Sequence, residues 1–512
     1  LEGGGIDVVA SVGTGDELLE VVRGGGIDAA VLDIQTAPEN KKWWTLAAVA
    51  FGLFMIMLDN TVVNVALPSI QQSLHMSISQ LEWIVTAYAL TFAAFMLTGG
   101  KLADLIGRRR IFVIGLVVFT AASFACGIAP SSNWLIGART VQGIGAALMN
   151  PATLSIITAT FPPRQRGLAI GIWAGISAMA LAIGPLVGGL LTEHINWNWV
   201  FYINVPIGIV GIAASYAFIE ESRDTSHEQR LDLPGLLSSG IGLFSLTYGL
   251  IEANNYGWTS GRILTAFVVG VVALALFVVL ELHQRLPMLE LELFKNGTFT
   301  GANAAMLLVG LAMFGVFFYV SLFMQQVLRY SPVQAGATFL PMTVLVILVA
   351  PQAGRMSDKV GSRWLVGAGL TLVAGSLLWY SRLDVSSNFW DILPGLIMGG
   401  FGMAMAMTPT TAAAMGSVPV DKAGVGSAVL NSMRQVGGSL GIAIMGAVVA
   451  HVAGLGHVGG RRFDPQAFTH GFHDALRLAA VFAFVGAIVG VSTLRNVRHG
   501  DEPKPAAAVE GA

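Results

Sequence analysis

Apolar stretches long enough to cross a lipid bilayer as helices recur along most of this 512-residue chain. A helix needs about 20 apolar residues to span the hydrocarbon core. Only 11% of the residues are charged, whereas an average soluble domain has about 25%. The chain is therefore predicted to be an all-α polytopic membrane protein. The fourteen predicted transmembrane helices cover residues 43–67, 81–99, 111–129, 134–158, 167–191, 200–219, 231–251, 263–281, 299–325, 335–353, 364–381, 391–413, 424–450 and 475–494.

A charged loop occurs twice, at corresponding places between apolar stretches. The first copy is Gly100–Arg109, and the second, 254 residues later, is Gly354–Arg363. The two copies share glycine, aspartate and arginine positions. Such a repeat predicts a duplicated helical bundle, which is the architecture of many secondary transporters. The first copy follows the second predicted helix and the second copy follows the tenth, so two extra helices are expected between two six-helix halves.

The predicted organisation has five parts. A non-transporter extension covers residues 1–40, the first six-helix bundle 41–219, a linker with two additional helices 220–295, the second bundle 296–497, and a disordered tail 498–512. Lys and Arg concentrate in alternate loops, which predicts that both termini are cytoplasmic. We expect the bacterial cytoplasmic membrane and no cleaved signal peptide. The net charge of −2 disfavours a nucleic-acid partner.

Residues 1–37 do not fit the helical pattern. Two short strand-like segments flank a short amphipathic helix, and together they resemble a fragment of a response-regulator receiver domain. Asp33 stands where such a domain accepts phosphate, but the acidic pair that would hold Mg²⁺ is missing. We favour a fusion remnant over a regulatory appendage.

Three ionisable residues fall inside predicted transmembrane helices, where charge is costly. Asp59 is interpreted as a proton carrier or cation ligand, with a structural carboxylate as the alternative. Arg139 is its expected partner, either exchanging with it or forming a static pair. Arg434 is assigned equally to a cavity lining and to bracing of its helix.

Other segments suggest moving parts. Pro185 kinks the fifth helix, and Gly184 and Gly188 allow close packing, so this helix is expected to seal the two halves. In the two loops, Asp104 and Asp358 are interpreted as gating residues, whereas the basic residues also serve membrane orientation. The predicted gating set is Gly100, Asp104, Gly107, Arg108, Arg109, Asp358, Arg363, Gly184, Pro185 and Gly188.

Taken together, these motifs resemble those of the major facilitator superfamily, in particular its fourteen-helix drug:H⁺ antiporters, the bacterial multidrug efflux permeases. The similarity covers residues 41 to about 497 and includes the segments Leu58–Pro68, Gly100–Arg109, Trp197–Gly208 and Asn431–Gly438. Two positions depart from the family pattern, since Asn198 and Leu105 stand where Arg is common. The thirteenth helix also lacks the acidic residues with which some relatives bind dications.

The resemblance implies a proton-coupled antiporter that exports amphipathic drugs by alternating access. Asp59 and Arg139 would couple protons. The expected substrate cavity consists of Asn60, Asn64, Tyr88, Gln142, Phe317, Gln325, Asn431 and Arg434. Its partners would be the substrate, protons and the bilayer; a monomer is one expectation for an oligomeric state that the sequence leaves open.

The sequence also leaves alternatives open. The chain is a candidate for a dedicated exporter of one metabolite, antibiotic or lipid, and, in another class, for a membrane-anchored signalling protein using residues 1–37. We predict no enzymatic activity, because the sequence has no recognisable catalytic triad and no Walker-type loop. We expect no cofactor and no metal; His470 and His473 have the spacing of metal ligands but are assigned to a solvated loop.

Overall fold

The computed structural model describes residues 39–223, 231–284, 287, 289–418, 422–454 and 464–494. The predicted receiver-like fragment with Asp33, His457 and the tail 498–512 lie outside these residues. Contacts within the chain separate residues 1–43 from residues 44–512, and the helical bundle belongs to the second of these units.

Each of the fourteen predicted segments coincides with helix. The first half contains α2 (Glu39–Leu74), α3 (Ile78–Ile106), α4 (Arg108–Gly127), α5 (Ser132–Thr160), α6 (Pro163–His194), α7 (Trp199–Tyr202) and α8 (Asn204–Phe218). Two helices follow, α9 (Leu233–Tyr256) and α10 (Gly261–His283). The second half contains η1 (Leu291–Lys295), α11 (Gly297–Leu322), η2 (Phe323–Val327), α12 (Pro332–Thr338), α13 (Leu340–Val360), α14 (Ser362–Tyr380), α15 (Phe389–Gly416), α16 (Ala423–Ala453) and α17 (Pro465–Thr493).

Twelve helical stretches of the described chain are long and apolar enough to cross a membrane. The protein is thus an all-helical, multi-pass membrane protein. Helices α5 and α14, with 29 and 19 residues, pack in the same bundle but are less apolar. A count of fourteen spans therefore stays a prediction that depends on these two helices.

Local sequence explains where several helices begin and end. Ser77 accepts a hydrogen bond from the backbone of Gln80, whose side chain accepts one from Ser77 N, and this reciprocal cap starts α3. Gly107 separates α3 from α4 with φ of 127°, a conformation that favours glycine. The last helix begins at Pro465 after the Asp464 cap, earlier than the predicted start at 475, because its first turns are too polar to resemble an apolar stretch.

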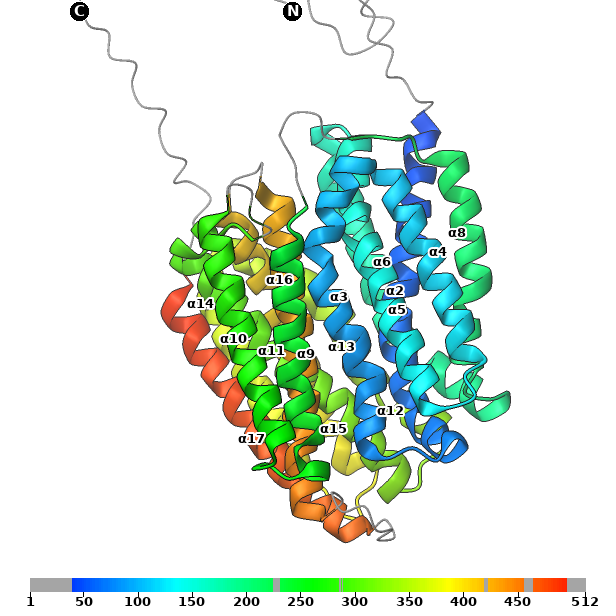
Figure 1. Cartoon of the computed structure of the whole chain (residues 1–512), viewed down its shortest axis with the longest axis vertical. Coiled ribbons are helices and arrows are strands. Elements are labelled where there is room, and N and C mark those ends of the chain that lie inside the picture. The colour runs from blue at the N-terminus through cyan, green and yellow to red at the C-terminus, as the bar shows by residue number, and fades with distance from the viewer. Residues whose placement is uncertain are drawn as a thin grey trace, which may run out of the picture. The chain divides into compact units, whose positions relative to one another are not determined.

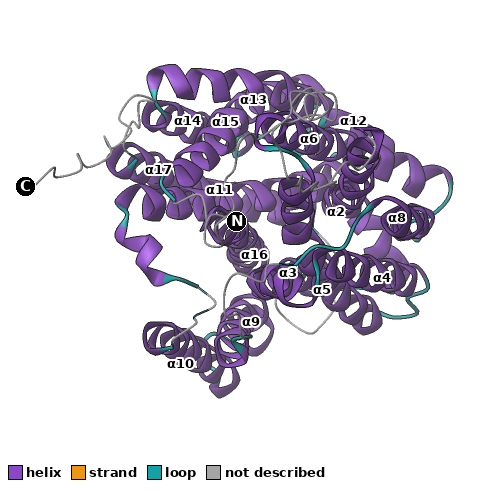
Figure 2. Ribbon diagram, turned by 90° about the horizontal axis from the view of Figure 1, so that it is seen from above, coloured by secondary structure: helices purple, strands orange, loops and turns teal. Residues whose placement is uncertain are grey.

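Helices α9 and α10 lie together at the edge of the bundle, beside α3 and α16 (Figure 2). Helix α9 packs against one helix of each half, whereas α10 packs mainly on α9. On α10 the side chains of Leu264, Val268, Val271 and Leu276 are at least half exposed, as expected for a helix that faces lipid. Along the chain the helices are ordered as six, two and six. In space, the two additional helices α9 and α10 form a pair at the edge where the two halves meet.

Two ends of the bundle are distinguished by their turns. We call the end that carries the turns at Gly107 and Gly361 the basic end; its α3–α4 turn lies at the upper end of the bundle in Figure 1. The opposite end carries the turns at His75–Ser77 and Ile128–Ser131, and we call it the far end.

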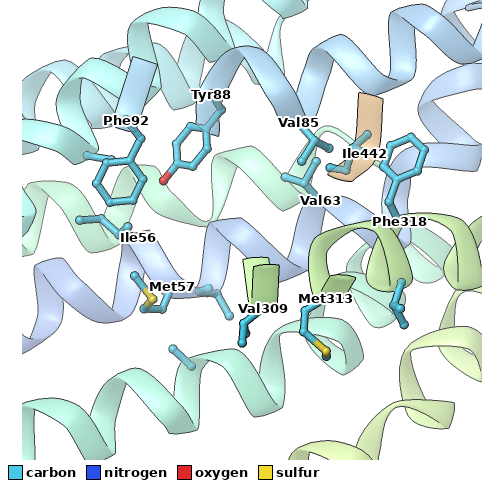
Figure 3. Packing of buried hydrophobic residues seen from close by; sticks show 14 of the residues in the cluster. Ile56, Met57, Val63, Val85, Tyr88, Phe92, Val309, Met313, Phe318 and Ile442 are labelled. Carbon is cyan, nitrogen blue, oxygen red and sulfur yellow. The ribbon is translucent and has the colours of Figure 1, made fainter. Parts of the chain in front are cut away.

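Apolar side chains fill the space where the halves meet. Val63 of α2 and Val85 of α3 face Ile442 of α16 and Phe318 of α11 (Figure 3), and all four are buried. This cluster joins the first half to the second through packing, because without water the hydrophobic effect contributes little between transmembrane helices.

Candidate functional site

A buried ion pair lies at the centre of the first half. Arg139 Nη1 of α5 donates to Asp59 Oδ2 of α2 over 2.5 Å, and both side chains are about 1% exposed. Because a buried carboxylate and a buried guanidinium are each expensive alone, pairing is what makes their burial tolerable. The structure therefore brings together the two residues that the sequence pairs.

The remaining carboxylate oxygen is also satisfied. Gln142 Nε2 donates to Asp59 Oδ1 over 2.9 Å, and Asn204 Nδ2 donates to the same atom over 3.1 Å. Gln142 also donates to Ser123 Oγ over 2.8 Å and accepts from Arg139 Nη1 over 2.6 Å. The carboxylate is thus held by three polar side chains from α5 and α8, and every one of them is buried.

The guanidinium of Arg139 has partners on its other side as well. Its Nε donates to Ile84 O of α3 over 3.1 Å, and its carbon lies 4.2 Å from the ring centre of Tyr88 and 5.8 Å from that of Phe201. Such cation–π contacts are strongest where water is excluded. Arg139 therefore keeps hydrogen-bond and aromatic partners on α3 if the carboxylate loses its charge.

The ends of the neighbouring helices give the depth of this site within the bundle. Ser123 stands four residues before the end of α4, Arg139 seven residues after the start of α5, and Asn204 opens α8. All three helix ends belong to the far end, so the site lies within roughly 10 Å of these helix ends at 1.5 Å per residue. Along α2 itself, Asp59 lies fifteen residues before Leu74, a distance of about 22 Å. The position of the ion pair relative to the membrane midplane stays a prediction.

A cavity lies between the halves on the other face of α2. Its wall consists of Met57, Asn60, Thr61, Asn64, Leu181, Val309, Gly310, Met313, Phe314, Phe317, Met403, Met407, Arg434 and Gln435. It measures about 60 Å³ in this conformation. Drug-sized ligands occupy about 300–1,000 Å³, so binding of such a molecule requires the halves to move.

The predicted cavity residues divide into two groups. Asn60, Asn64, Phe317 and Arg434 lie in the wall. The other four do not: Tyr88 and Gln142 lie beside Arg139, Gln325 donates to Val65 O, and Asn431 donates to Ser427 O of its own helix. Residue type alone pointed to a polar or aromatic lining, but the face of each helix decides which side chains reach the cavity.

The glycines of α6 allow two close helix crossings. A Cβ on Gly184 or Gly188 would meet Thr61 Oγ1 at 1.8 Å or Val62 O at 2.6 Å, so these glycines bring α6 against α2. On the other face, a Cβ on Gly189 would meet Pro332 O of the second half at 2.5 Å. Helix α6 therefore packs closely against a helix of each half at the far end.

Other polar contacts also cross between the halves near the far end. Gln326 donates to Gln71 Oε1 over 2.6 Å, Val333 N donates to Glu193 Oε2 over 2.9 Å, and Ser321 Oγ donates to Asn64 O over 3.1 Å. Together with α6 they close this end of the bundle in the present conformation.

Glu82 is a buried carboxyl group that the sequence-based prediction missed. It lies on α3, is 2% exposed, and accepts a hydrogen bond of 2.8 Å from the hydroxyl of Tyr319 on α11. Within the described residues it makes no ion pair. A glutamate four residues into a transmembrane helix is a usable signal, but it lies nearer the end of its apolar stretch than the three charges that were singled out.

The first charged loop is organised around Glu221, a second residue without an assigned role. Arg108 Nε donates to Asp104 Oδ1 over 3.1 Å, whereas Arg109 and Arg110 lie 3.9 and 3.7 Å from Glu221 Oε2. The same carboxylate accepts from both of their backbone N–H groups, and so caps α4. Glycine is favoured at Gly107 by its φ of 127°, and a Cβ there would also displace the carboxylate of Glu221, whose Oε1 would lie 2.5 Å away.

The second loop repeats the backbone of the first. Gly361 has a positive φ of 91°, like Gly107, and Arg363 stacks on Trp364. The side chain of Asp358 lies outside the described part, so its gating role stays a prediction.

Two single positions, Gly100 and Asn198, and the question of a metal site remain from the sequence analysis. A methyl group on Gly100 would be 3.6 Å from Pro151, an ordinary contact, so this glycine does not mark a close helix crossing. Asn198, where Arg is common in the family, donates to Gly127 O over 2.6 Å. In the described chain no group of three His, Cys, Asp or Glu residues is arranged to hold a metal.

Two helical halves, a cavity between them and a buried ion pair beside that cavity define a membrane transporter for small molecules. The family model of the Major Facilitator Superfamily matches residues 49–442, and the chain belongs to this superfamily. It is 37% identical to the multidrug resistance protein Stp of Mycobacterium tuberculosis over 79% of this chain and 75% of that protein. It is 35% identical to the tetracenomycin C resistance and export protein of Streptomyces glaucescens, over 81% and 77% of the two chains.

Solved structures agree on the fold. A bacterial homologue of the human lysosomal transporter Spinster, in an inward-facing and unoccupied conformation, superimposes with a TM-score of 0.63. The match covers 89% of this chain and 97% of the homologue at 18% identity.

Proposed function

We propose that this protein exports amphipathic drugs or related small molecules across the bacterial cytoplasmic membrane in exchange for protons. The relatives named for multidrug resistance and for antibiotic export support the substrate class. The basic end would face the cytoplasm, and with it both termini. The far end would then be the side from which protons arrive.

One observation carries the coupling hypothesis: helix α2 presents Asp59 to the buried ion pair on one face and Asn60 and Asn64 to the cavity on the other. A proton on Asp59 removes its charge and releases Arg139, so the ion pair between α2 and α5 is lost. Since the cavity wall moves with α2, the proton and the substrate act on one helix. Helix α4 ends, and helices α5 and α8 begin, within roughly 10 Å of the ion pair on the far side, which would give external protons a short path.

The energetics are sufficient for such an exchange. Each proton that enters down a membrane potential of 100 mV supplies about 2.3 kcal/mol. One proton therefore supports a concentration ratio of roughly fifty, because 1.4 kcal/mol corresponds to a factor of ten.

Gating is assigned to the far-end contacts. Gly184, Pro185 and Gly188 lie in the seal made by α6, while Asp104, Arg108 and Arg109 organise the turn at the basic end. In this proposal the far-end seal breaks when the substrate leaves, and the cavity then opens between α2, α11 and α16. The alternative of a dedicated exporter keeps the same machinery and differs only in breadth.

The test is energy-dependent efflux from cells that express the wild type or Asp59→Asn. The substitution should abolish efflux of every compound in a fluorescent drug panel, because the neutral amide cannot bind and release a proton. Glu292→Gln is the matched control, since that carboxylate is 79% exposed. Undiminished efflux by a membrane-inserted Asp59→Asn variant would refute the proposed coupling, and protection against one compound alone would identify a dedicated exporter.

A further inference from the structure

Among the described residues that line the cavity, Arg434 is the one with a charged side chain, and none is Asp or Glu. The surface is mostly apolar and includes four methionines and two phenylalanines, with the amides of Asn60, Asn64 and Gln435 among the polar groups. The cavity therefore has a positive charge on an adaptable, polarisable lining.

Within the described chain, the guanidinium of Arg434 makes no hydrogen bond and no ion pair, and its Nε is buried without an acceptor. The guanidinium of Arg139, by contrast, donates hydrogen bonds to Asp59, Gln142 and Ile84 O. An arginine inside a membrane protein is expensive unless an anion or carbonyl groups compensate its charge. Arg434 thus has donors that are free to bind a ligand.

The helix that carries Arg434 is firmly placed. A Cβ on Gly310 of α11 would meet Arg434 O at 2.2 Å, and one on Gly437 would meet Leu307 O at 2.0 Å. These close contacts fix α16 against α11 at and beyond the arginine. The side chain therefore projects from a rigid element, which is the arrangement that a preorganised ligand contact needs.

We propose that the substrates of this transporter are amphipathic molecules with a negatively charged group, a carboxylate or an acidic phenol, and that Arg434 binds this group. The apolar body of the substrate would lie on Met313, Met403, Met407, Phe314 and Phe317. This inference rests on the proposed function and narrows it, because lipophilic cations would be repelled from the same cavity.

The charge of the substrate also determines the driving force. Export of a monoanion with entry of one proton moves two positive charges inward per cycle. A neutral substrate moves one and a monocation moves none. With an interior-negative potential, the transport of anions should therefore depend most steeply on voltage.

The binding test uses a matched pair of fluorescent probes, pyrenebutyrate and its uncharged amide. The wild-type protein in detergent should bind the acid at least ~10-fold more tightly than the amide, a difference of about 1.4 kcal/mol. Arg434→Gln should abolish this preference while leaving the affinity for the amide unchanged, and Arg434→Lys should restore part of it. Absence of a preference in the wild type, or an equal loss for both probes in Arg434→Gln, would overturn the proposal and assign Arg434 to bracing of α16.

Transport separates this inference from the proposed function. In liposomes with an imposed potential, acid-driven proton movement should be lost in Arg434→Gln and amide-driven movement retained, whereas Asp59→Asn should lose both. If the acid binds preferentially but moves no protons in the wild type, the substrate inference stands and the antiport proposal fails. If the amide drives protons as well as the acid in both proteins, antiport stands and the role of Arg434 is refuted.

Discussion

At the scale of single residues, Asp59 and Glu82 show two ways of holding a carboxyl group away from water. Asp59 is paired with Arg139 and accepts from Gln142 and Asn204. Glu82 accepts from the hydroxyl of Tyr319, which also lies 3.5 Å from Ile442 O. One hydroxyl hydrogen cannot point directly at two acceptors at once, but a protonated Glu82 would donate to Tyr319, which could then donate to Ile442 O. The geometry of this pair therefore suits a neutral carboxyl group.

A neutral Glu82 predicts that two substitutions in the Glu82–Tyr319 pair have unequal effects on the stability of the protein. Tyr319→Phe leaves the buried carboxyl group of Glu82 without its hydrogen-bond partner, and should destabilise the protein by about 1–3 kcal/mol. Glu82→Gln, which keeps both shape and hydrogen bonding, should be close to neutral. Thermal unfolding in detergent checks the pair, and a Glu82→Gln variant that is the less stable of the two would show that Glu82 is ionised.

At the scale of helices, α6 determines how the far end closes. Its glycines bring it against α2 on one face and against α12 on the other. Such crossings require the absence of side chains, because the neighbouring helix takes the place where a Cβ would stand. Glycines elsewhere on the same helix are not used in this way: a Cβ at Gly175 would have no atom of the described structure within 4 Å.

Gly189→Ala should therefore favour conformations that are open at the far end. The added methyl would meet Pro332 O, a backbone atom that cannot turn away. The measurement is the labelling rate of Gln326→Cys in a Cys126→Ser background, with an impermeant thiol reagent applied from outside. Labelling should rise with Gly189→Ala and remain at the parent level with Gly175→Ala. Equal rates in all three proteins would show that this crossing does not hold the seal.

The helices also show which features could be predicted from the sequence and which could not. Helix positions followed from hydrophobic length, and the close packing of α6 followed from its Gly-Pro pattern, because both depend on local composition. The cavity wall followed only in part, since four of the eight predicted residues line it. Tyr88 and Gln142 lie on the wrong faces of α3 and α5, and Glu82, Glu221 and Asn204 gained roles only through partners that are remote in sequence.

At the scale of the whole molecule, polar contacts between the halves gather at the far end. Gln71 and Gln326 belong to different halves, whereas Gln80 and Ser132 are bonded at the same end within the first half. Alternating access requires the first pair to separate during the cycle, and leaves the second pair in place.

A reversible cross-link distinguishes these two pairs. Joining Gln71→Cys to Gln326→Cys with a bifunctional methanethiosulfonate should stop transport, and reduction should restore it. The same treatment of Gln80→Cys with Ser132→Cys should leave transport near the wild-type rate. Continued transport with Gln71 and Gln326 joined would contradict movement of the halves at this end.

The proposed mechanism depends on one exchange, protons against substrate through Asp59. The most direct measurement uses purified protein in liposomes with an acidic interior and a trapped pH dye, to which a substrate is added outside. We expect the interior to become alkaline when substrate is added to wild-type or Glu292→Gln liposomes, and Asp59→Asn liposomes to give no response although the protein is folded. A response of equal size from Asp59→Asn would contradict the mechanism, because protons would then be moving by another route.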